Sequence, residues 1–206
     1  MKIGIIGAAT VGMTLAAKFA NCGQDVLLAN SRDPESLSAS LSALDASLTA
    51  TSSADLLASA EIVFLCLPWV KVQDVLSPGI DWNRRILVDT TNIFTSYAPN
   101  FQIADLKGDS GSEIVARLAP SARVVKAFNT IPFATMFTAE PTGTRRVLFV
   151  AGDDAAATST VASLIRDVGL HPIVLGPLAS AGRQMELGGI FSGLELFTPA
   201  EERLAP

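Results

Sequence analysis

Short apolar runs rich in β-branched residues alternate with amphipathic stretches along almost the whole chain. The runs that predict strands are residues 1–7, 24–29, 48–50, 62–67, 86–89, 124–128, 147–150 and 172–175. The stretches that predict helices are residues 13–20, 35–44, 53–58, 70–76, 111–118, 154–168 and 179–187. Strands that are apolar on both faces and separated by helices are typical of a parallel sheet with helices on both sides. The pattern therefore predicts an α/β fold with a doubly wound, mainly parallel sheet.

The alternation continues to the end of the chain without a repeat or a low-complexity linker. We expect one compact domain over residues 1–206, with a core of about 1–150 and a short C-terminal extension of about 151–206 that continues the same sheet. The chain has 206 residues, of which 49% are hydrophobic, so it can form one well-packed domain. It is too short for a nucleotide-binding domain followed by a large helical substrate domain.

The first predicted strand runs directly into a glycine-containing turn, Gly7-Ala8-Ala9-Thr10-Val11-Gly12, and a helix follows. This is the layout of a Rossmann-type dinucleotide-binding unit, in which the helix N-terminus faces a pyrophosphate. Gly7 allows the tight turn, Gly12 allows close packing of the helix, and Ala9 replaces the usual second glycine. We expect Gly7, Ala9, Thr10, Val11 and Gly12 to bind a dinucleotide; the alternative is an ordinary glycine-rich turn.

The second strand ends in Asn30-Ser31-Arg32, where NAD-specific folds usually carry an acidic residue that binds the ribose 2′-hydroxyl. An amide, a hydroxyl and a guanidinium instead suit a 2′-phosphate, so the sequence predicts NADP(H). Asp33 is the nearest carboxylate, but Pro34 follows it, which favours a helix cap over a ribose ligand. The alternative for Arg32 is a solvated surface arginine.

Polar or sharply turning segments follow the later strands, and ligands of open α/β sheets bind at the carboxyl ends of strands. Leu67, Pro68 and Trp69 end the fourth strand and are expected to lie along the ribose or nicotinamide. Thr90 belongs to a small polar cluster at residues 89–92. Residues 126–132 end the sixth strand and Gly176-Pro177 the last one. We expect these ends to converge on one pocket.

Composition excludes several classes of function. The net charge is −5 and no basic stripe is present, so we expect no nucleic-acid partner. The arginine pairs at 84–85 and 145–146 precede apolar strands and are interpreted as solvated turn residues.

The two cysteines have no metal-ligand companions, so no metal is expected. The first strand leaves no room for a signal peptide, and the longest apolar run is too short to span a membrane. We expect a cytoplasmic protein with no membrane partner.

Three stretches together resemble the NADPH-dependent coenzyme F420 reductase family: residues 7–12, the N-S-R-D-P-E-S-L segment at 30–37, and the K-A-F-N-T segment at 126–130. The nucleotide-binding domain of that family is similar to the reductase domain of the six-transmembrane ferric reductases. The resemblance implies NADPH at Ser31 and Arg32. It also implies an acceptor ring, coenzyme F420, FMN or FAD, stacked on the nicotinamide near Asn129 and Thr130.

The titratable residues agree with transfer between two rings. A carbonyl reductase needs a positioned proton donor, but His171 is expected in a turn and Tyr97 lacks a lysine four residues later. Lys126 is either a donor or an edge or snorkelling side chain. Hydride transfer between flat rings requires positioning more than acid–base catalysis. We therefore expect no catalytic acid or base, with Asn129, Thr130 and Met185 positioning the acceptor.

The segment 179–191 is expected to help close the acceptor site, with Met185 as an adaptable apolar contact; the alternative is that this segment simply packs on the sheet. The overall prediction is an NADP(H)-dependent oxidoreductase with a small-molecule electron acceptor, acting as a homodimer. A non-catalytic NADP(H)-binding module that senses redox state or binds a partner is the alternative from another class. An imine or β-hydroxyacid reductase is the enzymatic rival, and the length of the chain argues against it.

Overall fold

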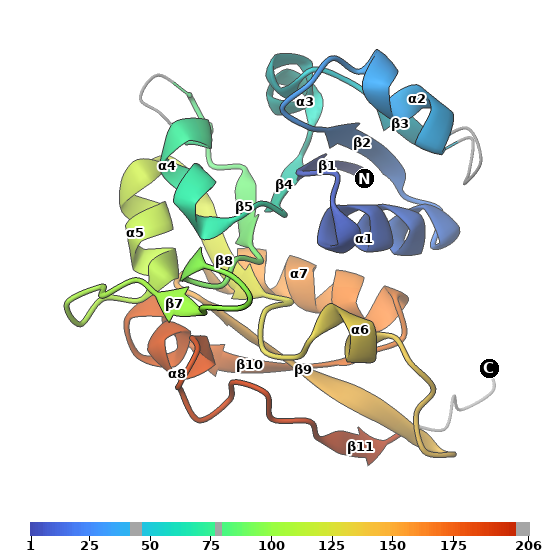
Figure 1. Ribbon diagram of the computed structural model, residues 1–206. Helices are drawn as coiled ribbons and strands as arrows, with labels where there is room; N and C mark the ends of the chain where they lie inside the picture. Colours follow the sequence, from blue (N-terminus) through green and yellow to red (C-terminus); the bar gives the residue numbers. More distant parts are fainter. Residues whose placement is uncertain (42–46, 77–79, 201–206) are drawn as a thin grey trace.

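The computed structural model describes residues 1–41, 47–76 and 80–200, and for residues 38–40 it describes the backbone alone. Its centre is one sheet covered by helices on both faces (Figure 1). The sheet contains β1 (Lys2–Ile6), β2 (Asp25–Ala29), β3 (Leu48–Ala50), β4 (Ile62–Leu65), β5 (Ile86–Asp89), β8 (Arg123–Ala127), β9 (Thr144–Gly152) and β10 (His171–Gly176). Their order across the sheet is β10-β9-β8-β5-β4-β1-β2-β3.

Six neighbouring strands of this sheet are all parallel: β3, β2, β1, β4, β5 and β8. Their order is that of a dinucleotide-binding Rossmann fold, in which the chain starts at the centre, builds outward to one edge and then returns to build the other half. The change of direction falls between β1 and β4, where the connections leave toward opposite faces. The predicted doubly wound, mainly parallel sheet is therefore confirmed, and the point where a ligand is expected is fixed between these two strands.

Two hydrophobic cores lie on the two faces of the sheet. One face is covered by α1 (Thr10–Asn21), α2 (Glu35–Leu41), α6 (Phe133–Met136) and α7 (Ala155–Asp167). The other is covered by α3 (Ser53–Ser59), the 3-10 turn η1 (Trp69–Lys71), α4 (Val72–Val75), α5 (Gly111–Leu118), the π-helical turn η2 (Leu178–Gly182) and α8 (Arg183–Met185). The predicted end of the second helix at residue 44 lies outside the described residues.

An aromatic cluster ties the centre of the first core together. Phe19 of α1 lies 5.0 Å from Phe64 of β4 and 6.3 Å from Phe128, measured between ring centroids. Tilted and edge-on ring pairs at these distances add to the stabilisation that burial provides. Phe128 directly follows β8 and has a φ of 62°, which is unusual for a bulky residue. The packing of its ring holds the chain in this conformation, which sets the path of the next residues at the sheet edge.

The last two strands of the sheet run opposite to the six parallel ones, because β8 and β9 are antiparallel while β9 and β10 are parallel. The connection from β8 to β9 contains only the single turn α6, whereas a parallel return requires a crossover, usually a full helix. The carboxyl end of β10 therefore lies at the opposite edge of the sheet from that of β8. The expectation that Gly176-Pro177 joins the other strand ends in one pocket is wrong.

The pattern also missed three short strands and the burial of Arg146. β6 (Phe94–Ser96) and β7 (Gln102–Ile103) form a separate hairpin after β5, and β11 (Phe197–Pro199) pairs with β9. Arg146, expected in a solvated turn, is 2% exposed. Its Nε lies 2.9 Å from Glu195 Oε1, and Nη1 donates to the carbonyls of Met136 and Thr138. This arginine joins the C-terminal segment to β9, which the local sequence around residues 145–146 does not indicate.

Candidate functional site

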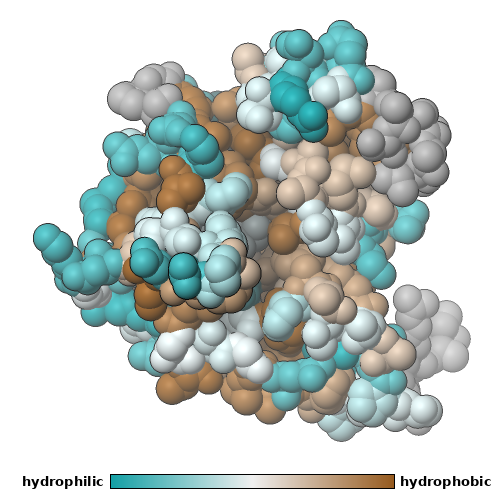
Figure 2. Space-filling view, viewed as in Figure 1, coloured by the Kyte–Doolittle hydropathy of each residue, from teal (hydrophilic) through white to brown (hydrophobic). Residues whose placement is uncertain are grey.

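A cleft crosses the carboxyl edge of the parallel strands at the point where the strand order reverses. Figure 2 shows this face of the molecule hollowed near its centre. The cleft has two parts that share Ala9, Cys66, Leu67 and Pro68. The first part, with a volume of about 610 Å³, reaches the loop after β2, and we refer to it as the β2 end. The second, of about 280 Å³, reaches Phe94 and Tyr97 of the hairpin and is called the hairpin end.

The glycine turn forms the floor between the two ends. A Cβ on Gly7, whose φ is 112°, would lie 2.0 Å from the carbonyl oxygen of Cys66, and one on Gly12 would lie 1.7 Å from that of Gly7. Both positions therefore require glycine for packing alone. Ala9 is the N-cap of α1 and provides no capping side chain. The backbone N–H groups of the first turn of α1 are thus available to an anion in the cleft, as a pyrophosphate site requires.

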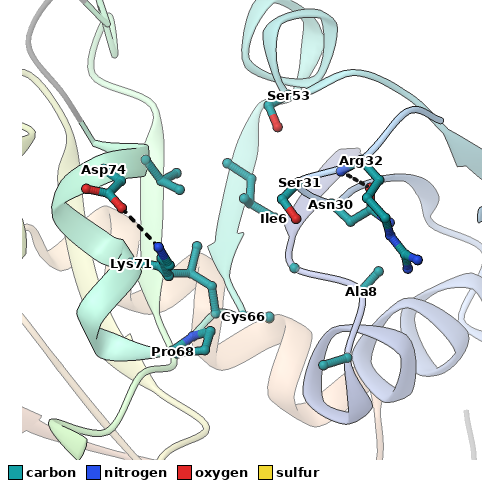
Figure 3. A pocket seen from close by; sticks show the side chains of 14 residues that line it. Ile6, Ala8, Asn30, Ser31, Arg32, Ser53, Cys66, Pro68, Lys71 and Asp74 are labelled. Atoms are coloured by element: carbon teal, nitrogen blue, oxygen red, sulfur yellow. Dashed lines mark hydrogen bonds and ion pairs between the residues drawn. The ribbon is translucent and has the colours of Figure 1, made fainter. Parts of the chain in front are cut away.

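The loop after β2 forms one wall of the β2 end (Figure 3). The side chain of Asn30 shapes this loop, because its Oδ1 accepts the N–H of Arg32 at 2.8 Å and its Nδ2 donates to Ser36 Oγ at 3.2 Å. Ser31 and Arg32 are exposed, and the Arg32 guanidinium makes no ion pair within the described part of the chain. Asp33 contacts α2 through its backbone carbonyl, which accepts the hydroxyl of Ser36. The donors that remain for a ligand are those of Ser31 and Arg32.

The segment after β4 forms the opposite wall. Leu67 and Pro68 line both ends of the cleft, as predicted. Trp69 does not line either end: its ring is half-buried and lies against Gly111, at the start of α5. Lys71 faces the cleft across from Arg32, and its Nζ lies 3.4 Å from Asp74 Oδ2 (Figure 3). The position of Trp69 therefore does not support the predicted contact with a cofactor. Trp69 is the first residue of η1, and its ring points toward the start of α5.

The base of the hairpin end is polar but is occupied by internal hydrogen bonds. Thr90 is 6% exposed, and its Oγ1 donates to the carbonyl of Leu65 at 2.7 Å. Cys66 beside it is buried, and burial raises the pKa of its thiol to about 12. Its thiol is therefore neutral near neutral pH. Thr90 and Cys66 shape the wall here and present no charge to a ligand.

Three charged side chains are buried directly behind the hairpin end. Lys126 of β8 is completely buried, with its Nζ 3.1 Å from Asp89 Oδ2 and 3.4 Å from Glu186 Oε1. The same ammonium donates to the carbonyl of Thr91 at 3.0 Å. Lys126 is thus neither an edge residue nor a snorkelling one, and it does not reach the cleft as a proton donor. It connects β5, β8 and the C-terminal segment at one point.

The environment of each carboxylate determines how it titrates. Burial acts to raise the pKa of Asp89, but Lys126 and hydrogen bonds from Ser112 and Thr91 outweigh it and lower that pKa. Burial raises the pKa of Glu186, because Lys126 is shared with Asp89 and cannot fully compensate a second charge. Glu186 Oε1 accepts the N–H of Gly111 at 3.0 Å, while Oε2 is buried without a partner among the described atoms. The pKa of Lys126 is raised by Asp89 and Glu186 against the opposing effect of burial.

The residues predicted to position an acceptor lie behind the cleft surface. Asn129 and Thr130 are 7% and 3% exposed. Asn129 Nδ2 donates to the carbonyl of Met185 at 2.8 Å, and the carbonyl of Asn129 accepts Nδ2 of Asn92 at 3.1 Å. Asn92 lines the hairpin end, so Asn129 supports a cleft residue from behind. The Met185 side chain is 1% exposed in the hydrophobic core, which is the packing alternative stated for this segment.

The aromatic side chains of the hairpin are the site feature that the sequence interpretation missed. Phe94 and Tyr97 line the hairpin end, a position that the pattern of strands and helices does not predict for either residue. The spacing of Phe94, Tyr97 and Phe101 around a proline-containing turn was the available signal.

His171 begins β10, two strands away from β8, and lines neither end of the cleft. Among residues 1–41, 47–76 and 80–200, every helix is too short or too polar to span a membrane, and no cluster of His, Cys, Asp and Glu side chains could hold a metal ion.

Comparison with known proteins agrees with this architecture. Residues 2–93, which contain the glycine turn and the loop after β2, match the family described as NADP oxidoreductase coenzyme F420-dependent. The crystal structure of the hypothetical protein SMa0349 from Sinorhizobium meliloti superimposes with a TM-score of 0.86 at 37% identity, over 96% of both chains. The chain belongs to this oxidoreductase family. A structure from Arthrobacter sp. FB24, named as a proposed F420-dependent NADP reductase, has a TM-score of 0.78 at 29% identity, over 90% of this chain and 89% of that one.

A curated relative extends the likeness to larger proteins. The metalloreductase STEAP3 of Rattus norvegicus is 29% identical over 185 residues, which is 90% of this chain and 36% of that protein. The chain therefore spans about a third of the length of the curated relatives it matches. The likeness therefore covers most of the fold described above.

Proposed function

We propose that the protein transfers a hydride between NADPH and a flat conjugated acceptor such as coenzyme F420, FMN or FAD. The observation that carries the proposal is the β2 end of the cleft, where Ser31 and Arg32 are exposed without internal ion pairs in the described chain and no acidic side chain takes the usual ribose position. A guanidinium and a hydroxyl are suited to a 2′-phosphate. The family match to NADP oxidoreductases supports the same cofactor.

The residues fit the cofactor along the whole cleft. The adenosine phosphate would be held by Ser31 and Arg32, and the pyrophosphate by the backbone N–H groups at the start of α1 after Ala9. The nicotinamide would then lie at the hairpin end, between Leu67-Pro68 and residues 90–92. NADPH supplies the hydride when it is bound. The protein holds the two rings in register and excludes water from between them.

The chemistry balances without a protein acid or base. One hydride leaves NADPH with its electron pair and gives NADP⁺, while the acceptor ring takes up that hydride and one proton from water. Among the residues that line the hairpin end, the only titratable side chains are Cys66, whose pKa of about 12 keeps it neutral, and Tyr97. Positioning of reactants is sufficient for such a transfer, whereas carbonyl reduction requires a placed proton donor.

The proposal is tested by measuring NADPH oxidation with coenzyme F420, FMN, FAD and ferric citrate as acceptors, each with NADPH and with NADH. We expect turnover with at least one of the three ring acceptors and a preference for NADPH. Tight NADPH binding without oxidation in any of these mixtures would instead establish a non-catalytic NADP(H)-binding module. Equal use of NADH and NADPH would contradict the cofactor assignment.

A further inference from the structure

The hairpin β6–β7 carries exposed aromatic side chains that fold stability does not explain. Tyr97 is 50% exposed and Phe101 is 63% exposed. Both rings pack on Phe94, with centroid distances of 5.3 Å for Tyr97 and 5.6 Å for Phe101. Large apolar side chains that stay in water contribute little to folding, and a cluster of them marks a surface that binds something.

The hairpin is held firmly against the body of the protein. Ile93, at its base, is 5% exposed and packs against Gly111 at the start of α5. A backbone hydrogen bond from Ala104 N–H to the carbonyl of Ile93 at 2.9 Å closes the base of the hairpin. Phe94 N–H donates to the carbonyl of Asn92 at 2.8 Å in a tight turn at the start of β6. Rings on such a base are already in place before a ligand arrives, which lowers the entropic cost of binding.

Only part of the aromatic cluster faces the cleft. Phe94 and Tyr97 line the hairpin end together with residues 90–92, whereas Phe101 does not. Across the cleft stand the start of α1 at residues 9–11 and the Leu67-Pro68 turn. The volume of about 280 Å³ is that of a small-molecule site and is much too small for a protein partner. The charged side chains nearby, Asp89 and Lys126, are buried and bind each other, so this wall recognises shape and aromatic surface.

We propose that Tyr97 and Phe94 form the stacking platform for the acceptor ring and thereby select flat conjugated acceptors. This inference rests on the proposed function and adds the residues that determine acceptor specificity. Aromatic rings attract one another in offset or edge-on pairs, and the Tyr97 ring offers such a surface beside the position proposed for the nicotinamide. The phenolic hydroxyl has no part in the proposal, because stacking uses the ring alone.

The test compares Tyr97→Ala with Tyr97→Phe and with Phe101→Ala, a matched exposed aromatic on the same hairpin that does not line the cleft. Removing one ring contact should raise KM for coenzyme F420 and FMN about three- to tenfold, with the KM for NADPH nearly unchanged. Tyr97→Phe should restore the parent KM, and Phe101→Ala should leave it nearly unchanged. A KM that stays at the parent value in Tyr97→Ala, or rises equally in Phe101→Ala, would overturn the platform.

A binding measurement separates this inference from the proposed function. FMN and coenzyme F420 are titrated into protein saturated with NADP⁺, with quenching of their fluorescence as the readout. If the parent protein turns over no acceptor but binds a ring that Tyr97→Ala binds more weakly, the proposed function fails and the platform stands. No binding of either ring by the parent protein overturns the platform. A change of oligomeric state in Tyr97→Ala and Phe101→Ala, without a change in ring binding, also overturns the platform. The aromatic cluster is then a contact between copies of the chain.

Discussion

The two ends of the cleft are built in opposite ways. At the β2 end, Ser31 and Arg32 are exposed, and the side chain of Lys71 on the facing wall is 64% exposed. Behind the hairpin end, Lys126 and Asp89 are completely buried, and Lys126 is paired with both Asp89 and Glu186. Exposed charged groups are accessible to a ligand, even where one of them is paired at the surface as Lys71 is with Asp74. Buried groups that satisfy one another instead fix the backbone around them. The difference separates the residues that can bind a ligand from the residues that hold the cleft backbone in position.

The largest effect is expected from breaking the buried cluster. Lys126→Ala removes the one cation between Asp89 and Glu186, leaving two buried carboxylates without a counter-charge. Loss of one partner from a buried ion pair costs about 3–5 kcal/mol of folding free energy. Urea unfolding should show a loss of that size, together with a lower thermal midpoint.

Two further variants check the cause of that loss. Lys71→Ala removes an exposed lysine whose partner Asp74 is also exposed, and it should leave the midpoint almost unchanged. Adding Glu186→Gln to Lys126→Ala should recover part of the lost stability, because an uncharged amide is easier to bury. Equal midpoints for Lys126→Ala and Lys71→Ala would show that the cluster does not hold the sheet edge together.

A smaller effect, on binding and not on folding, is expected at the other end. Arg32→Ala removes a charge-assisted contact to the proposed 2′-phosphate, worth about 1.5–3 kcal/mol, or roughly one to two decades in affinity. NADPH binding should weaken by that factor while NADH binding and the thermal midpoint stay nearly unchanged. Arg166→Ala is the control, since this exposed arginine lies on α7, away from the cleft. Equal losses for both cofactors would contradict the assignment of Arg32.

The two ends also differ in how far the sequence predicted them. The β2 end is local: the glycine turn, β2 and the Asn30-Ser31-Arg32 loop follow one another within about thirty residues, and each signals its own conformation through glycine or through apolar periodicity. Here the structure agrees with the predicted elements and brings Ser31 and Arg32 to the cleft. The Asn30 amide was the exception, because its role in the loop depends on Ser36, a partner in the next helix.

The hairpin end depends on contacts between residues far apart in the chain. Lys126 and Glu186 meet only because the C-terminal segment returns across the sheet after β10, and that path follows from the antiparallel β9, which periodicity does not indicate. Strand direction is decided by the connection, and the one-turn α6 gave no strong signal. The sequence also predicted Trp69 and Met185 at the cleft. Composition indicates that a side chain is apolar, but it does not indicate which of two apolar surroundings the side chain enters.

The pH dependence of stability offers a finer test of the buried cluster. Burial raises the pKa of Glu186 above its ordinary value of 4.5. A carboxyl group whose pKa is higher in the folded than in the unfolded chain contributes stability that is present below about pH 4.5 and is lost as the pH rises through the folded value. The unfolding free energy of the parent protein, relative to that of Glu186→Gln, should therefore fall as the pH rises above about 4.5.

The other two members of the cluster lose their contributions to stability outside the pH range of this test. The pKa of Asp89 is lowered, so its contribution is lost only as the pH falls below 3.8. The pKa of Lys126 is raised, so its contribution is lost only above 10.5. Urea unfolding of both proteins at several pH values between about 5 and 8 measures the difference directly. Parallel curves for parent and variant would mean that Glu186 is already ionised throughout this range.

The smallest effect is expected at His171, the single histidine of the sequence and therefore its single imidazole that could serve as a general acid or base. It lies at the start of β10, two strands from β8, and lines neither end of the cleft. His171→Ala should change kcat and both KM values by no more than a few-fold, because transfer between rings needs no imidazole. A general acid or base contributes about 10²–10⁴-fold to the rate, so a loss of that size in a folded variant would place proton transfer by the protein in the mechanism. That result would also remove the contrast between a binding end and a positioning end, since a third region would then take part in the chemistry.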